Sequence, residues 1–500
     1  MLDKRLVAAV ALYSLYLLYK RSKDPYVKYN KHVPKAWTIP VVKNLTDVLF
    51  HYWDSDEQAV KRARQYGGKT WVGEIPGVGK MFHLESPEMI EFMLKDQFEM
   101  FIKGDYLHWA LEPVMGNGIF NVDGQAWKVQ RKAISNIFHV KNFRDFFMHI
   151  FVEHTEKVLC VLGKAADSGK ELDFHDLMHR FTLKTFSKIA FGYDFDLVEN
   201  TDPESNRFGK AFNRAQAIAA RRVGTPTAWF EERFLGVGKE LEDSVAILDE
   251  TVYKVIEARR QDIAAGKQTD DLLDRFMRLK DDDGNQLSDV MLRDLVMNML
   301  VAGRDTTAEA LSWLIYLLAD APKAKEQIRN EVAEMCSARP DYNEIQNLKY
   351  THAAILEGQR LHPSVPHDVK EAKEDLFLPD GTFIGKGDAV VWSNYAMGRA
   401  PYLWGDDVDE FKLERFLVTD PETGNLSVKN ESQYKFPVFN AGPRVCLGMN
   451  MAILEGKTTL AMMLREFDFE IMPNPPVVGD RNITHLMRWG MNVKVKRIQV

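Results

Sequence analysis

The sequence predicts a mainly α-helical fold with a small β part. Most segments between residues 86 and about 360 carry helical patterning, and the longest helical pattern of the chain runs from Leu287 to Leu318. Ser288 can cap the start of that pattern, and Pro322 lies just past its end. Between residues 295 and 302 the pattern is apolar almost all round, which is typical of a helix buried through a core.

The other expected elements are shorter. Residues 69–84 are rich in β-branched and aromatic residues with Gly between them, which predicts a hairpin. Pro87 directly after Ser86 marks the start of a helix. Strand-like runs recur in residues 375–397, and a helix over about 447–466 precedes a last pair of strands. The β-type patterns are few, so the sheet is expected to be the minor part of the fold.

The first 23 residues stand apart from the rest. Residues 6–19 form an apolar and aromatic run flanked on both sides by Lys and Arg. As a helix this run spans about 21 Å, less than the roughly 30 Å of a bilayer core. A cleaved signal peptide and a helix that only touches the bilayer are the alternatives, but no small-residue cleavage site follows. We expect an uncleaved membrane anchor over 1–23, a stiff, Pro-containing, non-helical connector over 24–40, and one domain over 41–500 on the cytoplasmic side.

The composition argues against several classes of protein. The chain has 500 residues, 45% of them hydrophobic and 27% charged, which are ordinary globular values. The formal net charge is −7, and no block of Lys and Arg is long enough to suggest a nucleic-acid partner. The three cysteines, Cys160, Cys336 and Cys446, form no CxxC pair, which argues against a disulfide framework and favours a reducing compartment. At most one of them needs a special role, and the other two are expected to be small buried hydrophobes.

Cys446 lies in the most informative segment, the loop Phe439-Asn-Ala-Gly-Pro-Arg-Val-Cys-Leu-Gly448. A thiolate that binds a metal must be stabilised without being protonated, and backbone amides in a tight turn do this. Gly442 and Gly448 permit such a turn and the close approach of a flat ligand. The helix that follows points its positive end toward the sulfur. The alternative is a buried cysteine in a glycine-containing loop.

This decapeptide resembles the FxxGxRxCxG signature of the cytochrome P-450 superfamily at all five fixed positions, which are Phe439, Gly442, Arg444, Cys446 and Gly448. The resemblance implies a cytochrome P-450 fold with a long central helix over the haem. It implies that Cys446 is the axial thiolate ligand of a haem b iron, where a thiolate favours O–O cleavage. Arg444 would pair with a haem propionate, and Phe439 would pack against the ring. The implied activity is that of a haem-thiolate monooxygenase, which uses O2.

A second motif, Ala302-Gly303-Arg304-Asp305-Thr306-Thr307, lies in the middle of the long buried helix. Gly and Thr are poor choices inside a helix and a buried acid is expensive, which points to a working site. By the resemblance, Ala302 and Gly303 let the haem and oxygen come close. Asp305 and Thr306 would form the acid–alcohol pair that relays protons to dioxygen. The alternative is that Thr306 bonds back to the carbonyl one turn earlier and only bends the helix.

Two further pairs match the superfamily. Glu357 and Arg360 share one helix face, and such a pair standing alone is usually a surface salt bridge of little worth. Here it matches the ExxR motif, which pairs with a downstream Arg, and Arg415 fills that place. The proline usually found two residues before that Arg is Leu413 in this chain, so the turn departs from the usual pattern at that position. The implied role is structural support of the cysteine loop.

The other pair is Trp127 and Arg131, four residues apart on one expected helix. The resemblance implies that both donate to a haem propionate, through the indole N–H and the guanidinium. A core Trp beside a surface Arg is the alternative.

In detail the chain resembles the fatty-acid omega-hydroxylases typified by the plant wax and cutin enzymes, through residues 118–124, 302–307, 361–366 and 378–383. The resemblance implies terminal hydroxylation of a fatty acid, with the carboxylate far from the haem near Arg221 or Arg222. The implied substrate pocket contains the following residues, each of which could equally be ordinary core: Val301, Ala302, Thr306, Val365 and Met487.

The alternatives are an in-chain fatty-acid hydroxylase or epoxidase and a monooxygenase of another lipophilic substrate. More remote are a haem-thiolate hydroperoxide isomerase and a haem protein without turnover, and the intact pair Asp305 and Thr306 argues against both. No GxGxxG opens a βαβ unit. Electrons from NADPH are therefore expected through a separate diflavin cytochrome reductase, at the endoplasmic reticulum membrane, with the catalytic domain facing the cytoplasm.

Overall fold

The computed structural model describes residues 24–36, 43–135, 138, 143–195, 197–199, 207–267, 271–280 and 284–498. The expected membrane anchor over residues 1–23 lies outside these ranges. Within them, none of the helices combines the length and the apolar character needed to cross a bilayer.

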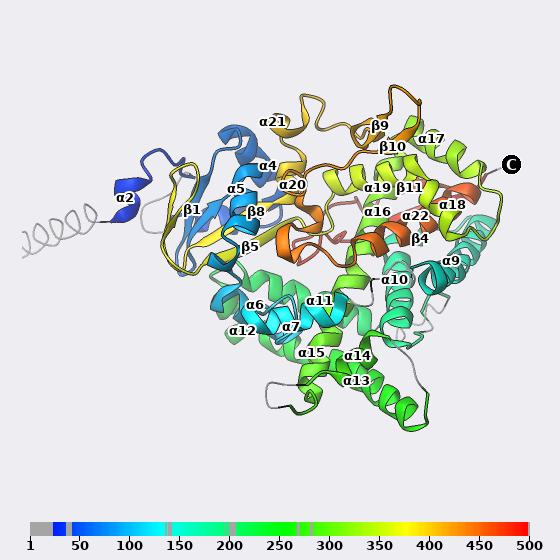
Figure 1. Ribbon diagram of the computed structural model, residues 1–500, viewed down its shortest axis with the longest axis horizontal. Coiled ribbons are helices and arrows are strands. Elements are labelled where there is room, and N and C mark those ends of the chain that lie inside the picture. Colours follow the sequence, from blue (N-terminus) through cyan, green and yellow to red (C-terminus); the bar gives the residue numbers. More distant parts are fainter. Residues whose placement is uncertain are drawn as a thin grey trace, which may run out of the picture.

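The described part is mainly helical, with a small β portion, as predicted (Figure 1). The N-terminal half contains the helices α2 (Pro25–Tyr29), α3 (Leu45–Phe50), α4 (Ser55–Tyr66), α5 (Pro87–Glu91), α6 (Gly104–Met115), α7 (Gly124–Ser135), α9 (Met148–Ser168), α10 (Phe174–Phe191), α11 (Arg207–Arg222), α12 (Ala228–Phe234) and α13 (Val237–Ala264). The C-terminal half contains α14 (Leu272–Arg278), α15 (Asp289–Leu300), α16 (Thr306–Ala319), α17 (Pro322–Ala333), α18 (Tyr342–Asn347), α19 (Lys349–Leu361), α20 (Asn394–Gly398), α21 (Pro401–Trp404) and α22 (Met449–Glu466).

The long helix predicted over 287–318 is present in two parts, α15 and α16, joined by the π-helical turn Val301–Asp305. Its start is capped as expected, because the Ser288 side chain accepts a hydrogen bond from the Met291 N–H at 3.2 Å. In Figure 1 this helix runs from the lower edge into the middle of the molecule. Single π turns inside α-helices occur frequently at functional sites, and this one falls on the predicted motif.

The strands form small sheets. The main sheet has the order β1-β2-β8-β5-β3, with only β2 and β8 parallel, and lies on the left of Figure 1. Its strands are β1 (Trp71–Ile75), β2 (Gly79–His83), β3 (Phe101–Ile102), β5 (His367–Ala372) and β8 (Ala389–Ser393). The remaining sheets are β11-β12-β4, β10-β9 and β6-β7, made of β4 (Leu172–Asp173), β6 (Leu376–Phe377), β7 (Phe383–Ile384), β9 (Leu417–Thr419), β10 (Leu426–Val428), β11 (Phe467–Ile471) and β12 (Asn492–Arg497).

The predicted hairpin over 69–84 is confirmed as β1 and β2, and the last strand pair as β11 and β12. The prediction of a non-helical connector over 24–40 was wrong in its first part. Pro25–Tyr29 is a short helix, because proline is tolerated at the first helical position and the Asp24 side chain caps the Tyr26 N–H at 3.0 Å.

Candidate active site

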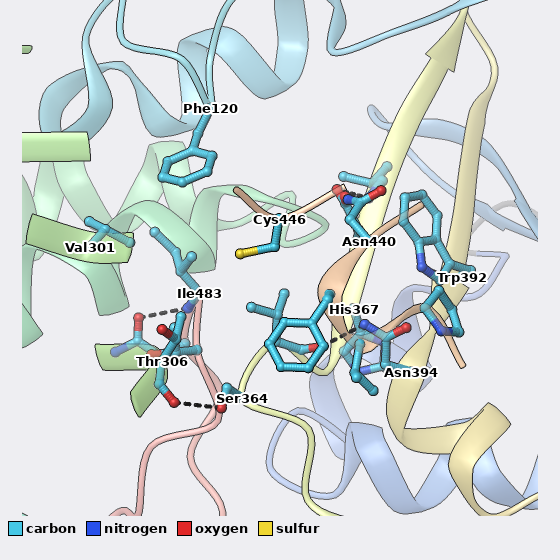
Figure 2. A pocket seen from close by; sticks show the side chains of 18 of the residues that line it. Phe120, Val301, Thr306, Ser364, His367, Trp392, Asn394, Asn440, Cys446 and Ile483 are labelled. Atoms are coloured by element: carbon cyan, nitrogen blue, oxygen red, sulfur yellow. Dashed lines mark hydrogen bonds between the residues drawn. The ribbon is translucent and has the colours of Figure 1, made fainter. Parts of the chain in front are cut away.

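A cavity of about 600 Å³ lies between the central helix, the cysteine loop and the main sheet. Figure 2 shows the Cys446 sulfur pointing into it, toward Val301 on the central helix and Ile483 in the loop before β12. The Cys446 side chain is accessible although it lies deep in the fold, because it faces this internal space. The walls are mainly apolar, which suits a flat hydrophobic cofactor and a hydrophobic substrate.

The cysteine loop is held in one conformation by its own backbone. The Cys446 N–H donates to the Phe439 carbonyl at 2.7 Å. Gly442 has a φ of +60°, and a Cβ there would lie 2.1 Å from the Leu94 carbonyl oxygen, so only glycine fits. Burial raises the pKa of the Cys446 thiol, while hydrogen bonds from backbone N–H groups, first that of Gly448, and the Arg131 charge act in the opposite direction.

Cationic side chains surround one edge of the cavity. Arg131 lines it and donates to the Val445 carbonyl at 2.6 Å. Arg444 also lines it, pairs with Asp123 at 2.7 Å and lies 4.7 Å from the ring of Trp127. Trp127 and Arg131 are both on α7 and both reach the cavity, so the predicted pair is brought beside the cysteine loop.

Lys370 on β5 is a residue that the sequence analysis missed. It is only 2% exposed, and its Nζ has no hydrogen-bond partner among the described residues. Burial, together with the charges of Lys103 and Arg444, holds the pKa of Lys370 well below its usual range, against the opposing charge of Asp368. Strand alternation places Lys370 on the same face as the core residue Ala372, and no local sequence signal distinguishes it from an edge lysine.

These residues fit a haem. The guanidiniums of Arg131 and Arg444 line one edge of the cavity and can pair with propionates, and the Cys446 thiol faces the adjoining apolar space. Cys446 would hold the iron, while Trp127, Arg131 and Arg444 would hold the propionates. When bound, a haem with a thiolate ligand supplies the activation of dioxygen.

The central helix contributes Ala302, Gly303 and Thr306 to the cavity wall. A Cβ on Gly303 would lie 1.9 Å from the Phe186 ring, so packing against α10 already requires a glycine there. The Thr306 hydroxyl donates to the Ala302 carbonyl at 2.6 Å, which is the back-bonded geometry considered above as the alternative. Because the hydroxyl donor is used inside the helix, the oxygen lone pairs are what Thr306 offers to the cavity.

Asp305 does not join Thr306 at the cavity wall, which the predicted acid–alcohol pair requires. Its carboxylate is fully buried on the far side of the π turn. It accepts from Gln216 at 2.7 Å, is paired with Arg304, and lies 3.4 Å from the Nδ1 atom of His179. Helical geometry turns adjacent residues about 100° apart, which explains why only one of the two faces the cavity.

The expected substrate residues are divided in the same way. Val301 and Val365 line the cavity, as predicted. Met487 was expected there, and this was wrong, because it is packed in the core while Ile483 lines the wall. The loop before β12 has no periodicity from which side-chain direction can be inferred, so the position was misplaced by four residues.

Arg221 and Arg222 were expected to bind a substrate carboxylate, and the structure contradicts this. Arg221 donates to Glu231 at 2.7 Å, and Arg222 donates to Glu232 at 2.7 and 2.8 Å. Both acids lie on α12, ten residues further along, and their position opposite the arginines depends on the turn between α11 and α12. Neither guanidinium is free for a ligand.

Glu357, Arg360 and Arg415 are brought together as the ExxR motif implies. Arg360 donates to both Glu357 oxygens at 2.7 Å, and Arg415 lies 3.3 Å from the same carboxylate. Leu413 begins a 3₁₀ turn that carries Arg415, so the usual proline is not needed for the turn. The pair is fully buried rather than a surface salt bridge.

Comparison with known proteins agrees with this site. The cytochrome P-450 family model matches residues 34–490, and the chain belongs to this family of haem-thiolate monooxygenases. Cytochrome P-450 704C1 of Pinus taeda is 34% identical over 91% of this chain and 92% of its own length. Cytochrome P-450 704B1 of Arabidopsis thaliana is 32% identical over 94% of this chain and 95% of its own. Cytochrome P-450 monooxygenase cyp1 of Mycosarcoma maydis is 35% identical over 88% and 70%. Two of these relatives are plant proteins, in agreement with the plant-type branch that the sequence resembles.

Proposed function

We propose that this cytochrome P-450 hydroxylates a medium- or long-chain fatty acid at its terminal carbon. The observation that carries the proposal is a single continuous, mainly apolar cavity with the Cys446 sulfur in one part and an arginine without an acidic partner in another. An alkyl chain matches the apolar walls, and a carboxylate matches the arginine.

That arginine is Arg481. It lines the cavity, and none of the described residues accepts a hydrogen bond from its guanidinium or forms an ion pair with it. The Arg481 guanidinium lies 4.7 Å from the ring of Tyr52, and the charges of Asp56 and Arg221 act on it. The charged neighbour of Cys446 is a different arginine, Arg131. Burial lowers the pKa of Arg481, which leaves a poorly hydrated cation that a carboxylate would stabilise.

Terminal attack requires positioning, because terminal C–H bonds are stronger than internal ones. Val301 and Val365 line the cavity, as Thr306 does, and their β-branched side chains are stiff at χ1. A constriction of this kind would hold the end methyl in place, and positioning can outweigh a difference of a few kcal/mol between C–H bonds.

The test is spectral titration and product analysis with dodecanoic and hexadecenoic acids. We expect both to bind and to give mainly the terminal alcohol. Arg481→Leu should weaken acid binding by about tenfold, as for loss of one charge-assisted contact, and leave the binding of the matching alkane nearly unchanged. Arg221→Leu is the matched control. Dominant in-chain hydroxylation or epoxidation would reject terminal attack, and no response to any fatty acid would reject the substrate class.

The role proposed for Thr306 gives a second prediction. The Thr306 O–H donates to the Ala302 carbonyl, so the Thr306 oxygen can accept a hydrogen bond from a group in the cavity. Thr306→Ala should therefore keep NADPH consumption but lower the product per NADPH several-fold and raise peroxide. Ser312→Ala, which removes a buried hydroxyl on the same helix away from the cavity, is the control. If the Thr306 variant formed as much product per NADPH as the wild type, Thr306 would have only the role of bending the helix.

Electron supply and location belong to the same proposal. We infer that a separate diflavin reductase passes electrons from NADPH, and that residues 1–23 anchor the protein in the endoplasmic reticulum membrane with the catalytic domain in the cytoplasm. Lys128 and Lys132 support reductase docking, since both are exposed on α7, the helix that carries Trp127 and Arg131.

A further inference from the structure

Three metal-ligating side chains meet in the core outside the cavity. His175 and His179 lie on α10 and Glu309 lies on α16, the second part of the central helix. Their side chains are 8%, 4% and 0% exposed. They neither line the cavity nor belong to any motif that the sequence analysis used.

The three ligand atoms converge on one point. The Nε2 atoms of His175 and His179 are 3.2 Å apart, and they lie 2.9 and 2.8 Å from the Glu309 Oε1 atom. The histidines are four residues apart, so both project from one face of α10 toward the same carboxylate. We propose that this cluster binds a divalent transition-metal ion, with zinc as the preferred ion.

The spacing suits such an ion. Donors bound tetrahedrally to zinc at about 2.0–2.1 Å lie roughly 3.3 Å from one another. The observed separations are a few tenths of an ångström shorter, so the side chains would need to open only slightly. Two imidazole nitrogens and one carboxylate oxygen are also the ligand types that divalent zinc accepts.

Hydrogen bonding leaves a place for a cation. The Met487 N–H donates to the His175 Nε2 atom at 3.4 Å, the outer limit of a hydrogen bond, and an ion bound to this nitrogen would replace that weak contact. The other Glu309 oxygen, Oε2, is buried without a hydrogen-bond partner among the described residues and is available for a fourth position. Without an ion, imidazole N–H groups can donate to the Glu309 carboxylate, and a bound ion would take the place of those protons.

The surrounding charges and contacts support the same assignment. Asp305 and Arg304 on the π turn face the cluster and are paired with each other, and no arginine or lysine among the described residues forms an ion pair with Glu309. The Nδ1 atom of His179 lies 3.4 Å from the Asp305 Oδ1 atom. A carboxylate behind a ligating histidine is the usual arrangement that orients the ring at a metal site.

The ion would join α10 to the central helix one turn after Thr306, and would be the second metal of the protein besides the haem iron. Because both ligand-bearing helices are buried and regular, the site is rigid. Because the cluster is buried and does not line the cavity, the ion would have a structural role rather than a catalytic one.

The test uses the tag-free haem-loaded protein, treated with a chelator, reloaded with zinc and freed of excess metal. We expect elemental analysis to find about one zinc per haem iron, and the midpoint of thermal unfolding to rise on reloading, because a ligand of the native state stabilises it. Cobalt(II) should replace zinc and give the visible d–d bands of a four-coordinate site. His179→Gln and Glu309→Gln should each lower zinc retention at least tenfold while the haem iron content stays unchanged.

His154→Gln is the matched control, because His154 is an equally buried histidine outside the cluster, with its Nδ1 atom 3.1 Å from the Thr185 hydroxyl oxygen. It should retain zinc. Wild-type protein that holds no zinc after loading and shows no shift of thermal unfolding would overturn the proposal, since the cluster would then be held by protons alone. Zinc retained equally by both cluster variants would also overturn it. The wild-type measurements decide the question if a variant fails to fold.

Discussion

Replacing Cys446 with Ser should abolish the thiolate signature of the protein. Reduced, carbon monoxide-bound wild-type protein is expected to absorb at the red-shifted position that thiolate ligation produces, and the Cys446→Ser variant is not. The reason is geometric, because the sulfur is the soft ligand that this part of the cavity presents, and a hydroxyl in its place is a far weaker donor to iron. Monooxygenase turnover should fall to background in the same variant.

The other two cysteines provide matched controls. Cys160 and Cys336 are exposed and lie away from the cavity, which corrects the expectation that they would be buried hydrophobes. Cys160→Ser and Cys336→Ser should leave the spectrum unchanged. A shifted band that persists in Cys446→Ser, or disappears in either control, would refute the assignment of the ligand.

Replacing Glu357 with Ala should destabilise the protein by about 3–5 kcal/mol, the range observed when one partner of a buried ion pair is removed. Arg360 is fully buried, and its guanidinium would lose the two Glu357 contacts and retain only carbonyl acceptors, of which Gly398 and Val408 are the nearest. The Lys412 N–H, 2.9 Å from the same carboxylate, would lose its acceptor as well. Chemical denaturation followed by circular dichroism measures the free energy of unfolding.

The control is Glu91→Ala. Glu91 pairs with Lys95 across one helical turn at 2.6 Å, but in contact with solvent, where such pairs contribute little. It should show no clear change in the free energy of unfolding. If Glu357→Ala were as stable as Glu91→Ala, the buried triad would have no supporting role, and the interpretation of the ExxR motif in this chain would be wrong.

The position of the predicted elements followed from short-range signals. Ser288 and Ser86 cap helices where the sequence indicates, and the hairpin over 69–84 forms in the expected place. These predictions succeeded because capping, helical period and strand alternation act within a few residues. The cysteine loop was found for the same reason, since its turn, its N–H donors and its sulfur all lie within ten residues.

Side-chain partners between distant elements could not be predicted. Arg221 and Arg222 look free in the sequence, yet the fold places Glu231 and Glu232 against them, while Arg481 forms no ion pair with any described residue. The sequence does not show which charged side chains form ion pairs, because an ion pair depends on burial and on the distance between the two groups in the packed structure.

By itself, and through the resemblance of its cysteine loop, the sequence predicted a mainly α-helical haem-thiolate protein with Cys446 as the expected iron ligand. Only the tertiary structure decided that Asp305 faces the core rather than the cavity, that Lys370 is buried with no hydrogen-bond partner in the described part of the chain, and that His175, His179 and Glu309 converge. The physical reason is that a side chain's direction on its own element is a local property, whereas what it meets depends on how α10, the central helix and the main sheet pack together.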